Sequence, residues 1–358
     1  MTTNALRNDP PIDLVTGAFS YSGSAIAERL LGSGRRVRTL TFHPQREHPL
    51  QARVETFPYR FDDPAALTRS LDGVTTLYNT YWVRFDHGRT SFADAIENSR
   101  TLFSAAKRAT VERIVHVSIA NPSIDSPLPY FRGKALVESA LAEAGPLHSI
   151  VRPTWIFGGE RDVLTNNIAW ILRRTPVFPL PGSGGYLVQP VHVDDLARIC
   201  IEAAASDRDL VIDAAGPETM PFSDLVALIR SAVNARSPVI RIPPPLMAAV
   251  ARGLGLLVRD VVLTPDEIRG LMAGLLVSHA RPLGRIAFSE WLDEHKTSIG
   301  RSYANELHRH FTSAAAGTTR ARVRALCSVW TVGVRISLSA LESPANAGFS
   351  AVWSPVPS

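Results

Sequence analysis

The sequence contains little cysteine. Its 358 residues include two, Cys200 and Cys327, which is too few for a disulfide framework. Neither cysteine lies at a spacing typical of metal ligands, and His, Cys and acidic residues form no cluster along the chain, so we expect no metal site. The low cysteine content favours a reducing compartment, and we predict a cytoplasmic location.

Long apolar runs are also missing. The nearest candidate, residues 246–258, falls short of the roughly 18 apolar residues of a membrane span and is interrupted by Arg252. The segment Met1–Asp9 has neither an apolar core nor a cleavage pattern, so we expect no signal peptide and no transmembrane segment. With 45% hydrophobic and 20% charged residues, the chain can bury a sizeable core.

The excess of basic charge is small outside the C-terminal tail. The formal net charge is +5, but the tail from Thr312 onward contributes four arginines against one acid, Glu342. The rest of the chain then has 34 basic and 32 acidic residues, a net charge of +2, so we expect no nucleic-acid partner. Because the tail has little periodicity and many Ala and Ser residues, we expect residues 312–358 to be disordered.

Residues 10–155 alternate between strand and helix signals. This alternation predicts an α/β fold in which a doubly wound parallel sheet carries helices on both faces, as in a Rossmann domain. Strands are predicted at 12–16, 36–42, 53–59, 74–78, 113–117 and 148–152, and helices at 24–31, 92–109 and 130–144, with a further helix beginning at Pro64.

After residue 155 the pattern changes. Pro- and Gly-rich segments such as 177–182 are expected to be loops, and helical stretches are predicted at 194–205, 223–233, 245–257 and 265–275. We interpret residues 156–311 as a smaller, mostly helical substrate lobe that returns the segment 211–213 to the sheet as a strand. Asp194 and Asp195 are expected to cap the first of these helices.

The turn after the first predicted strand is typical of a phosphate-binding site. Small residues let the backbone approach a pyrophosphate, and the following helix presents unpaired N–H groups to it. Ser20 replaces the middle glycine of a Gly-x-x-Gly-x-x-Gly turn, and a left-handed backbone there would cost about 1 kcal/mol or more. The residues expected to contact a dinucleotide here are Gly17, Phe19, Ser20, Tyr21, Ser22 and Gly23.

The end of the second strand bears on cofactor preference. An acid at this point bonds the ribose 2′-hydroxyl of NAD, whereas a basic residue suits the 2′-phosphate of NADP. This strand ends in Thr41-Phe42-His43, followed by Arg46, with no acid. His43 is therefore a candidate cofactor contact, and the pattern favours NADP while leaving NAD open.

Three further residues suggest acid–base chemistry. Tyr130 and Lys134 lie four apart at the start of a predicted helix, and Ser118 ends the strand before it. A lysine beside a tyrosine stabilises the phenolate, so the phenol can exchange a proton near neutral pH. Ser118 could hold a substrate oxygen by a hydrogen bond.

Together with the glycine turn, these residues resemble the extended and atypical short-chain dehydrogenase/reductase superfamily, often described as NAD-dependent epimerase/dehydratase. The segments 151–158 (VRPTWIFG) and 190–197 (PVHVDDLA) support the resemblance, which covers about Ile12 to His310. Members similar to the 39 kDa accessory subunit of respiratory complex I and to the NmrA-like regulators are the most alike.

The resemblance implies roles for individual residues. Tyr130 would be the acid/base, Lys134 would lower its pKa and hold the nicotinamide ribose, and Ser118 would orient the substrate. Asn79, Thr80 and Pro153 would lie along the cofactor, and Asn98 would support the active-site backbone. Two departures stand out: Ser20 replaces a glycine, and Arg60 occupies the place where the family often has an aspartate near adenine.

The sequence therefore predicts an NAD(P)-dependent oxidoreductase or epimerase acting on a small alcohol or carbonyl substrate. The alternative is a non-catalytic NAD(P)-binding regulator or assembly factor. The intact Ser–Tyr–Lys set favours the enzyme, because non-catalytic relatives often lose the tyrosine. The substrate cannot be derived from the sequence, and a homo-oligomer is compatible with it.

Overall fold

The computed structural model describes residues 11–88, 90–159 and 161–311. The expectation of a disordered tail at 312–358 lies outside these residues. Seven parallel strands form the central sheet in the order β11-β6-β5-β4-β1-β2-β3, which confirms the predicted fold class. They are β1 (Ile12–Thr16), β2 (Arg36–Thr41), β3 (Val54–Pro58), β4 (Val74–Asn79), β5 (Arg113–Val117), β6 (Leu147–Pro153) and β11 (Leu210–Ala214).

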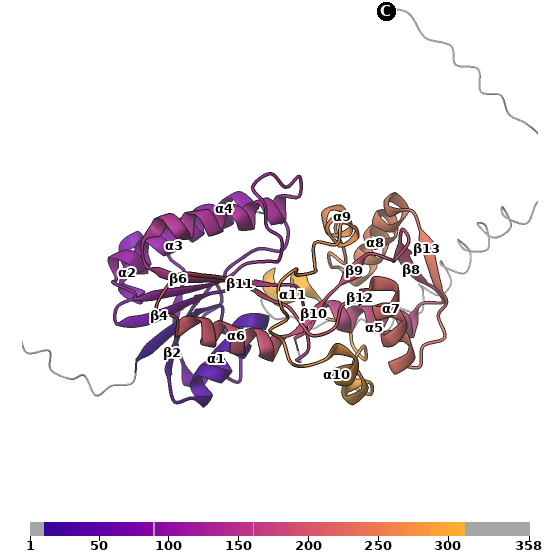
Figure 1. Cartoon of the computed structure of the whole chain (residues 1–358), viewed down its shortest axis with the longest axis horizontal. Helices are drawn as coiled ribbons and strands as arrows, with labels where there is room; N and C mark the ends of the chain where they lie inside the picture. Colours follow the sequence, from indigo (N-terminus) through magenta and orange to yellow (C-terminus); the bar gives the residue numbers. More distant parts are fainter. Residues whose placement is uncertain (1–10, 89, 160, 312–358) are drawn as a thin grey trace, which may run out of the picture. The chain divides into compact units, whose positions relative to one another are not determined.

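Helices cover both faces of this sheet (Figure 1). One face carries α1 (Tyr21–Gly32) and α6 (Val193–Ala204). The other carries α2 (Pro64–Ser70), α3 (Phe92–Arg108) and α4 (Pro129–Ala144), and a short 3-10 turn, η1 (Gln51–Arg53), precedes β3. The strand order reverses between β1 and β4, the point at which open α/β sheets bind their ligands.

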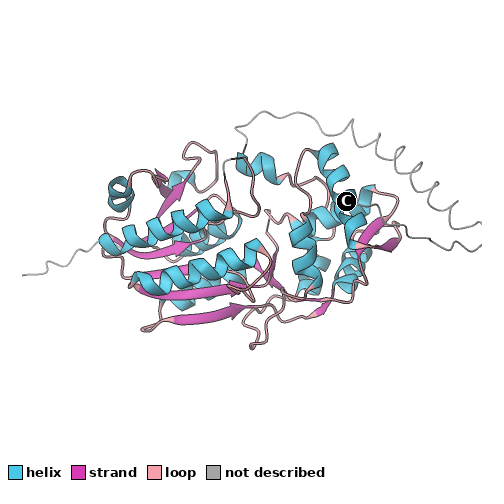
Figure 2. Cartoon of the chain, turned by 90° about the horizontal axis from the view of Figure 1, so that it is seen from above, coloured by secondary structure: helices cyan, strands magenta, loops and turns pink. Residues whose placement is uncertain are grey.

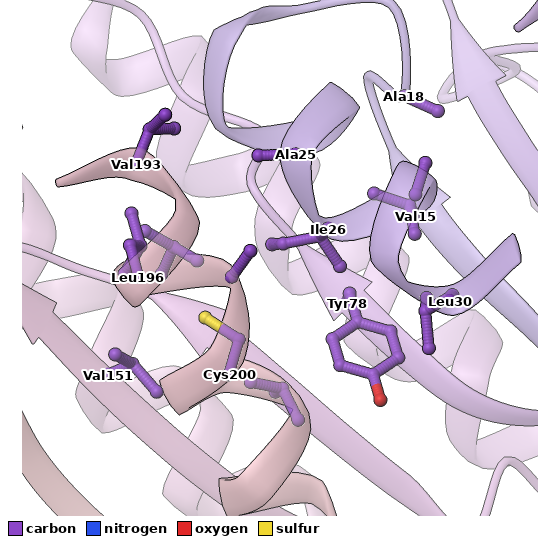
Figure 3. Packing of buried hydrophobic residues seen from close by; sticks show 14 of the residues in the cluster. Val15, Ala18, Ala25, Ile26, Leu30, Tyr78, Val151, Val193, Leu196 and Cys200 are labelled. Carbon is purple, nitrogen blue, oxygen red and sulfur yellow. The ribbon is translucent and has the colours of Figure 1, made fainter. Parts of the chain in front are cut away.

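The core under α1 and α6 explains why these two helices lie together. Ile26 and Leu30 of α1 and Leu196 and Cys200 of α6 are at most 2% exposed, and they belong to one buried cluster that also includes Val15 of β1 and Val151 of β6 (Figure 3). The sequence analysis placed the segment 194–205 in the substrate lobe. In the structure this segment is α6, and it packs on the sheet beside α1. The buried apolar residues of the two helices belong to the same cluster.

The remaining elements form a second, helix-rich part (Figure 2). Its own core includes Phe157, Phe222 and Phe288. Its helices are α5 (Leu164–Arg174), α7 (Phe222–Ala232), α8 (Pro244–Val258), α9 (Pro265–Met272), α10 (Phe288–His295) and α11 (Glu306–Phe311). No helix of the described residues is long and apolar enough to cross a membrane.

Three short strand pairs in this part were not predicted. They are β7 (Trp155–Phe157) with β10 (Pro190–His192), β8 (Phe178–Pro181) with β13 (Val239–Ile242), and β9 (Leu187–Val188) with β12 (Met220–Pro221). The sequence analysis interpreted 177–182 as a loop because of its prolines. β8 has a partner on one side only, so the missing N–H groups of Pro179 and Pro181 can lie on its open edge.

Candidate functional site

The turn between β1 and α1 is built as a close-approach site. Gly17 has φ +66°, a conformation that favours glycine. A Cβ added at Gly23 would stand 2.2 Å from the carbonyl oxygen of Gly17, so no larger residue fits there. These contacts explain why the sequence needs both glycines at this spacing.

Ser20 does not adopt the left-handed backbone that a glycine position of this motif would require. Its φ is −96° and its ψ is −178°, so replacing glycine costs no strain at this position. The Ser20 hydroxyl donates to the Gly17 carbonyl at 2.6 Å and caps no helix N–H. The first N–H groups of α1 therefore have no side-chain cap, which is the arrangement that receives a phosphate.

Thr16, at the end of β1, fastens this turn to the end of β4. Its hydroxyl accepts from the backbone N–H of Thr80 at 2.7 Å and lies 3.2 Å from Oδ1 of Asn79. The Thr80 hydroxyl donates back to the Thr16 carbonyl at 2.5 Å. Asn79 is fully buried, and its side-chain amide nitrogen lies 3.0 Å from Nδ1 of His116. Among the described residues, the Asn79 side chain therefore links the end of β4 to the end of β5.

The other residues predicted to contact the cofactor are packed in the core or bonded to neighbouring segments. The Phe19 side chain is 2% exposed and packs in the core, while Ser22 is half-buried. The Tyr21 hydroxyl donates to the carbonyl of Gly158 at 2.8 Å, which links α1 to the loop after β7. Pro153 ends β6 inside the sheet, and its carbonyl accepts from Ala120 N–H at 2.8 Å.

Basic side chains gather beside the turn. The Arg161 guanidinium donates to the Phe19 carbonyl, and the Phe19 ring centroid lies 5.0 Å from that of His48. Burial, then Arg161 and then Arg46 lower the pKa of His48 to about 4, so this imidazole is neutral at pH 7. His43 is half-buried at the end of β2, where its N–H donates to the Thr41 hydroxyl at 3.1 Å.

An aromatic group that the sequence analysis missed lies at the ends of β2, β3 and β4. Phe42, Tyr59, Phe61 and Tyr81 have ring centroids 4.6 to 6.2 Å apart. Phe42 is 59% exposed although its three partners are at least partly buried. The signal in the sequence was an aromatic residue just after each of three consecutive strands.

The Ser–Tyr–Lys residues occupy the end of β5 and the first turns of α4. Lys134 is 3% exposed, and its Nζ donates to the carbonyl of Val117 at 2.8 Å, the residue before Ser118. The Ser118 hydroxyl is buried and has no hydrogen-bond partner in the described structure. Lys134 Nζ also lies 4.8 Å from the centroid of the Trp82 ring.

The electrostatics at these residues differ from the sequence expectation. Burial is the main cause that raises the pKa of Tyr130; among charged groups, Glu267 raises it further and Arg84 lowers it. Burial lowers the pKa of Lys134 to about 7, partly offset by Glu138. The Tyr130 phenol is thus held protonated, and Lys134 is close to the point where it loses its charge at neutral pH.

The acids that act on Tyr130 belong to an ion-pair group that joins distant segments. Arg84, after β4, bonds Glu267 of α9 at 2.5 Å and pairs with Glu306 of α11. Asn98 of α3 supports the same region, because its amide donates to the Tyr81 hydroxyl at 2.9 Å.

Asp194 and Asp195 do not cap α6, contrary to expectation. His192 is the residue that caps it, through Nδ1 and the Asp194 N–H at 3.2 Å. Asp195 instead accepts from the N–H groups of Arg285 and Ile286 at 2.7 and 2.8 Å and pairs with Arg198. Its carboxylate therefore anchors a loop.

Residues 14–213 match the family described as "NAD dependent epimerase/dehydratase family". The chain belongs to this family. The match confirms the resemblance found in the sequence, and it covers the sheet, the turn and the Ser–Tyr–Lys residues.

Known proteins of several kinds are similar to this chain. A mitochondrial NADH dehydrogenase (ubiquinone) 1 alpha subcomplex subunit 9 from Arabidopsis thaliana is 23% identical, over 74% of this chain and 70% of the relative. A photosystem II assembly factor, Ycf39, from Cyanidium caldarium is 24% identical over 68% and 78%. An NADPH-dependent quinone oxidoreductase from Escherichia coli has a TM-score of 0.60 at 19% identity, over 84% and 100%, which shows a shared fold.

Proposed function

We propose that this chain is an NAD(P)-dependent oxidoreductase or epimerase acting on a small alcohol or carbonyl substrate. The observation that carries the proposal is the buried, unpartnered hydroxyl of Ser118. A buried hydroxyl without a hydrogen bond costs about 1–3 kcal/mol, and a substrate oxygen would satisfy it. Tyr130 and Lys134 lie one turn apart on α4, the helix that follows Ser118 in the chain.

The residues at the turn fit a dinucleotide. The Gly23 backbone leaves no room for a side chain, the N–H groups of α1 lack a side-chain cap, and Arg161 lies against the turn. Gly17 to Gly23 would hold the pyrophosphate, and His43 and Arg46 would lie toward the adenosine ribose. When bound, the nicotinamide ring supplies or accepts hydride.

The chain's own residues would manage the proton. Because its pKa is raised, Tyr130 keeps its phenolic proton at neutral pH and can donate it to an oxygen that gains charge as a carbonyl is reduced. Ser118 would donate a hydrogen bond to the same oxygen and fix its position. This favours carbonyl reduction as the direction in which Tyr130 works best.

A substrate screen tests the proposal. Wild-type protein, supplied with each of the four nicotinamide dinucleotides, should convert at least one alcohol or carbonyl compound: an oxidoreductase gives a net change in absorbance at the reduced-nicotinamide band, and an epimerase gives the product epimer with no net change in that band. Conversion that persists unchanged in Tyr130→Phe would contradict the proposed role of that residue. No conversion across a broad panel, with dinucleotide still bound, would favour the second function.

That second function is a regulator or assembly factor that binds dinucleotide without turnover. It is favoured by the position of Lys134. The Nζ of this residue is bonded to the Val117 carbonyl and lies over the Trp82 ring, so it is engaged within the protein and not directed at a ligand. Two similar proteins are also named as a subunit and as an assembly factor.

The proposals on cofactor preference and on cellular location rest on the sequence. NADP is favoured over NAD by His43 and Arg46 and by the absence of an acid after β2. The cytoplasmic location is still a prediction from the low cysteine content, although the Arabidopsis relative is named as mitochondrial.

A further inference from the structure

One segment of the described chain carries positive charges and no negative ones. Residues 225–259, which run from within α7 to just after α8, contain five arginines and no aspartate, glutamate or lysine. Asp224 and Asp260 border the segment on either side.

Four of these arginines are exposed and unpaired. Arg236, Arg241, Arg252 and Arg259 are exposed, and in the described part of the chain their side chains form no ion pair and no hydrogen bond. Arg198, by contrast, is bonded to Asp195, Glu202 and a backbone carbonyl, whereas the side chains of Arg29 and Arg69 are exposed and without a partner among the described residues, like those of the segment. Within residues 11–88, 90–159 and 161–311, these four guanidinium groups therefore have no partner.

The exposed face of α8 is apolar between its arginines. Leu256 is 79% exposed and Leu246 is 50% exposed. Leu246, Ala249, Gly253 and Leu256 recur at intervals of three and four, so they share one face, and Arg252 and Arg259 border it. The opposite residues, Ala251, Leu254, Gly255 and Val258, are buried against the rest of this part. We call the exposed residues Leu246, Arg252, Leu256 and Arg259 the α8 face.

Arg236 and Arg241 lie on the chain that leads into α8. Arg241 is on β13, which pairs with β8, and α8 and β13 are neighbours in Figure 1. These two residues extend the positive charge beyond the helix.

We propose that the α8 face binds the surface of an anionic lipid membrane. Guanidinium groups pair with lipid phosphates, while the leucines enter the boundary between headgroups and acyl chains. A nucleic acid would pair with the arginines but leave Leu256 in water. A second copy would place like charges against one another. An anionic bilayer satisfies both the charged and the apolar residues of the face.

Vesicle sedimentation with the full chain tests the proposal. The probes are vesicles of phosphatidylcholine alone and of phosphatidylcholine with about one third phosphatidylserine. The variants are Leu256→Glu and the double variant Arg252→Gln/Arg259→Gln. The matched controls are Leu147→Glu, at a leucine 45% exposed at the start of β6, and Arg29→Gln/Arg69→Gln, at exposed arginines of α1 and α2. Thermal melting of each variant reports on folding.

The proposal predicts binding to the anionic vesicles that weakens in 0.5 M salt, and little binding to neutral ones. The double variant should lower the partition coefficient by about 25-fold, since each arginine near such a surface contributes about fivefold. Leu256→Glu should lower it by about tenfold or more, and both controls should bind like wild type.

Three results would overturn it. Equal binding of wild type and the α8 variants would place the contact elsewhere on the chain. Binding of short RNA or DNA that Leu256→Glu leaves intact, without vesicle binding, would identify a nucleic acid as the partner. A dimer seen in sedimentation velocity and lost in Leu256→Glu, again without vesicle binding, would show that the face joins two copies.

Discussion

The two ends of the proposed cofactor site are built in opposite ways. At the glycine turn, the polar side chains of Thr16, Ser20 and Thr80 all have hydrogen-bond partners within the protein. Near Tyr130, buried polar atoms lack partners in the described structure, namely Ser118 Oγ, Trp82 Nε1 and His116 Nε2. The first end is complete by itself, whereas the second contains groups whose hydrogen bonds remain to be made.

This difference separates two properties of the molecule. A turn whose shape is fixed by its own bonds, followed by a helix whose first N–H groups have no side-chain cap, is suited to bind a pyrophosphate. Unsatisfied donors and acceptors destabilise the second end until a ligand bonds them. In the proposed function, dinucleotide binding thus depends on the turn, and turnover depends on what reaches Ser118 and Tyr130.

The largest expected effect is on turnover, at the end of the site near Tyr130. Tyr130→Phe should reduce turnover by about 100-fold to 10,000-fold, since it removes a positioned proton donor and keeps the ring. Dinucleotide affinity should barely change. Steady-state rates on a substrate that wild type converts provide the measurement, with Tyr186→Phe, a tyrosine bonded to Pro181 far along the chain, as control. Equal losses in both variants would refute a special role for Tyr130.

At the glycine turn, Gly17→Val should reduce dinucleotide binding more than any other single change. The residue has φ +66°, and its Cβ would meet Ser20 Oγ at 3.0 Å, so valine distorts the turn. A dinucleotide at a hundredfold excess over Kd should stabilise wild type by about 2.7 kcal/mol, and the variant should lose this gain in a thermal-shift assay. Gly32→Ala, at the other end of α1 with no atom within 4 Å, is the control. A shift that survives Gly17→Val would move the binding site away from the turn.

A smaller effect is expected from the aromatic group. If adenine stacks on the exposed ring of Phe42, then Phe42→Ala should weaken binding of adenosine-containing ligands by about fivefold or more, the usual effect of one lost stacking contact. Calorimetric titration with ADP-ribose and with nicotinamide mononucleotide separates the two halves of the cofactor. Leu147→Ala serves as a control of similar exposure. Weaker binding of the mononucleotide alone would place adenine elsewhere.

The subtlest test uses pH. Because the pKa of Lys134 falls from 10.5 to about 7 on folding, the unfolded chain binds a proton between these values that the folded chain does not. This residue therefore makes stability rise as pH increases from about 7 to 10. Urea unfolding across that range should show a shallower rise for Lys134→Met than for wild type. Parallel curves would mean that Lys134 keeps its charge in the folded protein.

The sequence predicted the features that depend on neighbouring residues. Strands β1 to β6, the turn at Gly17 and the start of α4 at Tyr130 could all be identified, since each follows from periodicity or from a local motif. The parallel sheet with helices on both faces followed from the alternation of strand and helix, whereas the order of its strands came from the structure. The structure corrected the conformation of Ser20, which a motif comparison treats as a glycine position.

Features that depend on distant contacts could not be predicted. Phe42 and Tyr81 come together because β2 and β4 lie near one another, and no local pattern encodes this. Arg84 meets Glu267 and Glu306 across 183 and 222 residues of chain. These acids, together with burial, set the protonation of Tyr130, so the electrostatics of the site needed the structure.

Direct titration of the full-length wild type with NAD, NADH, NADP and NADPH tests the central claim of dinucleotide binding most directly. Isothermal titration calorimetry should show one-site binding for at least one of the four, with NADP or NADPH favoured. A lack of measurable heat and of any thermal shift for all four at millimolar concentration would contradict the account.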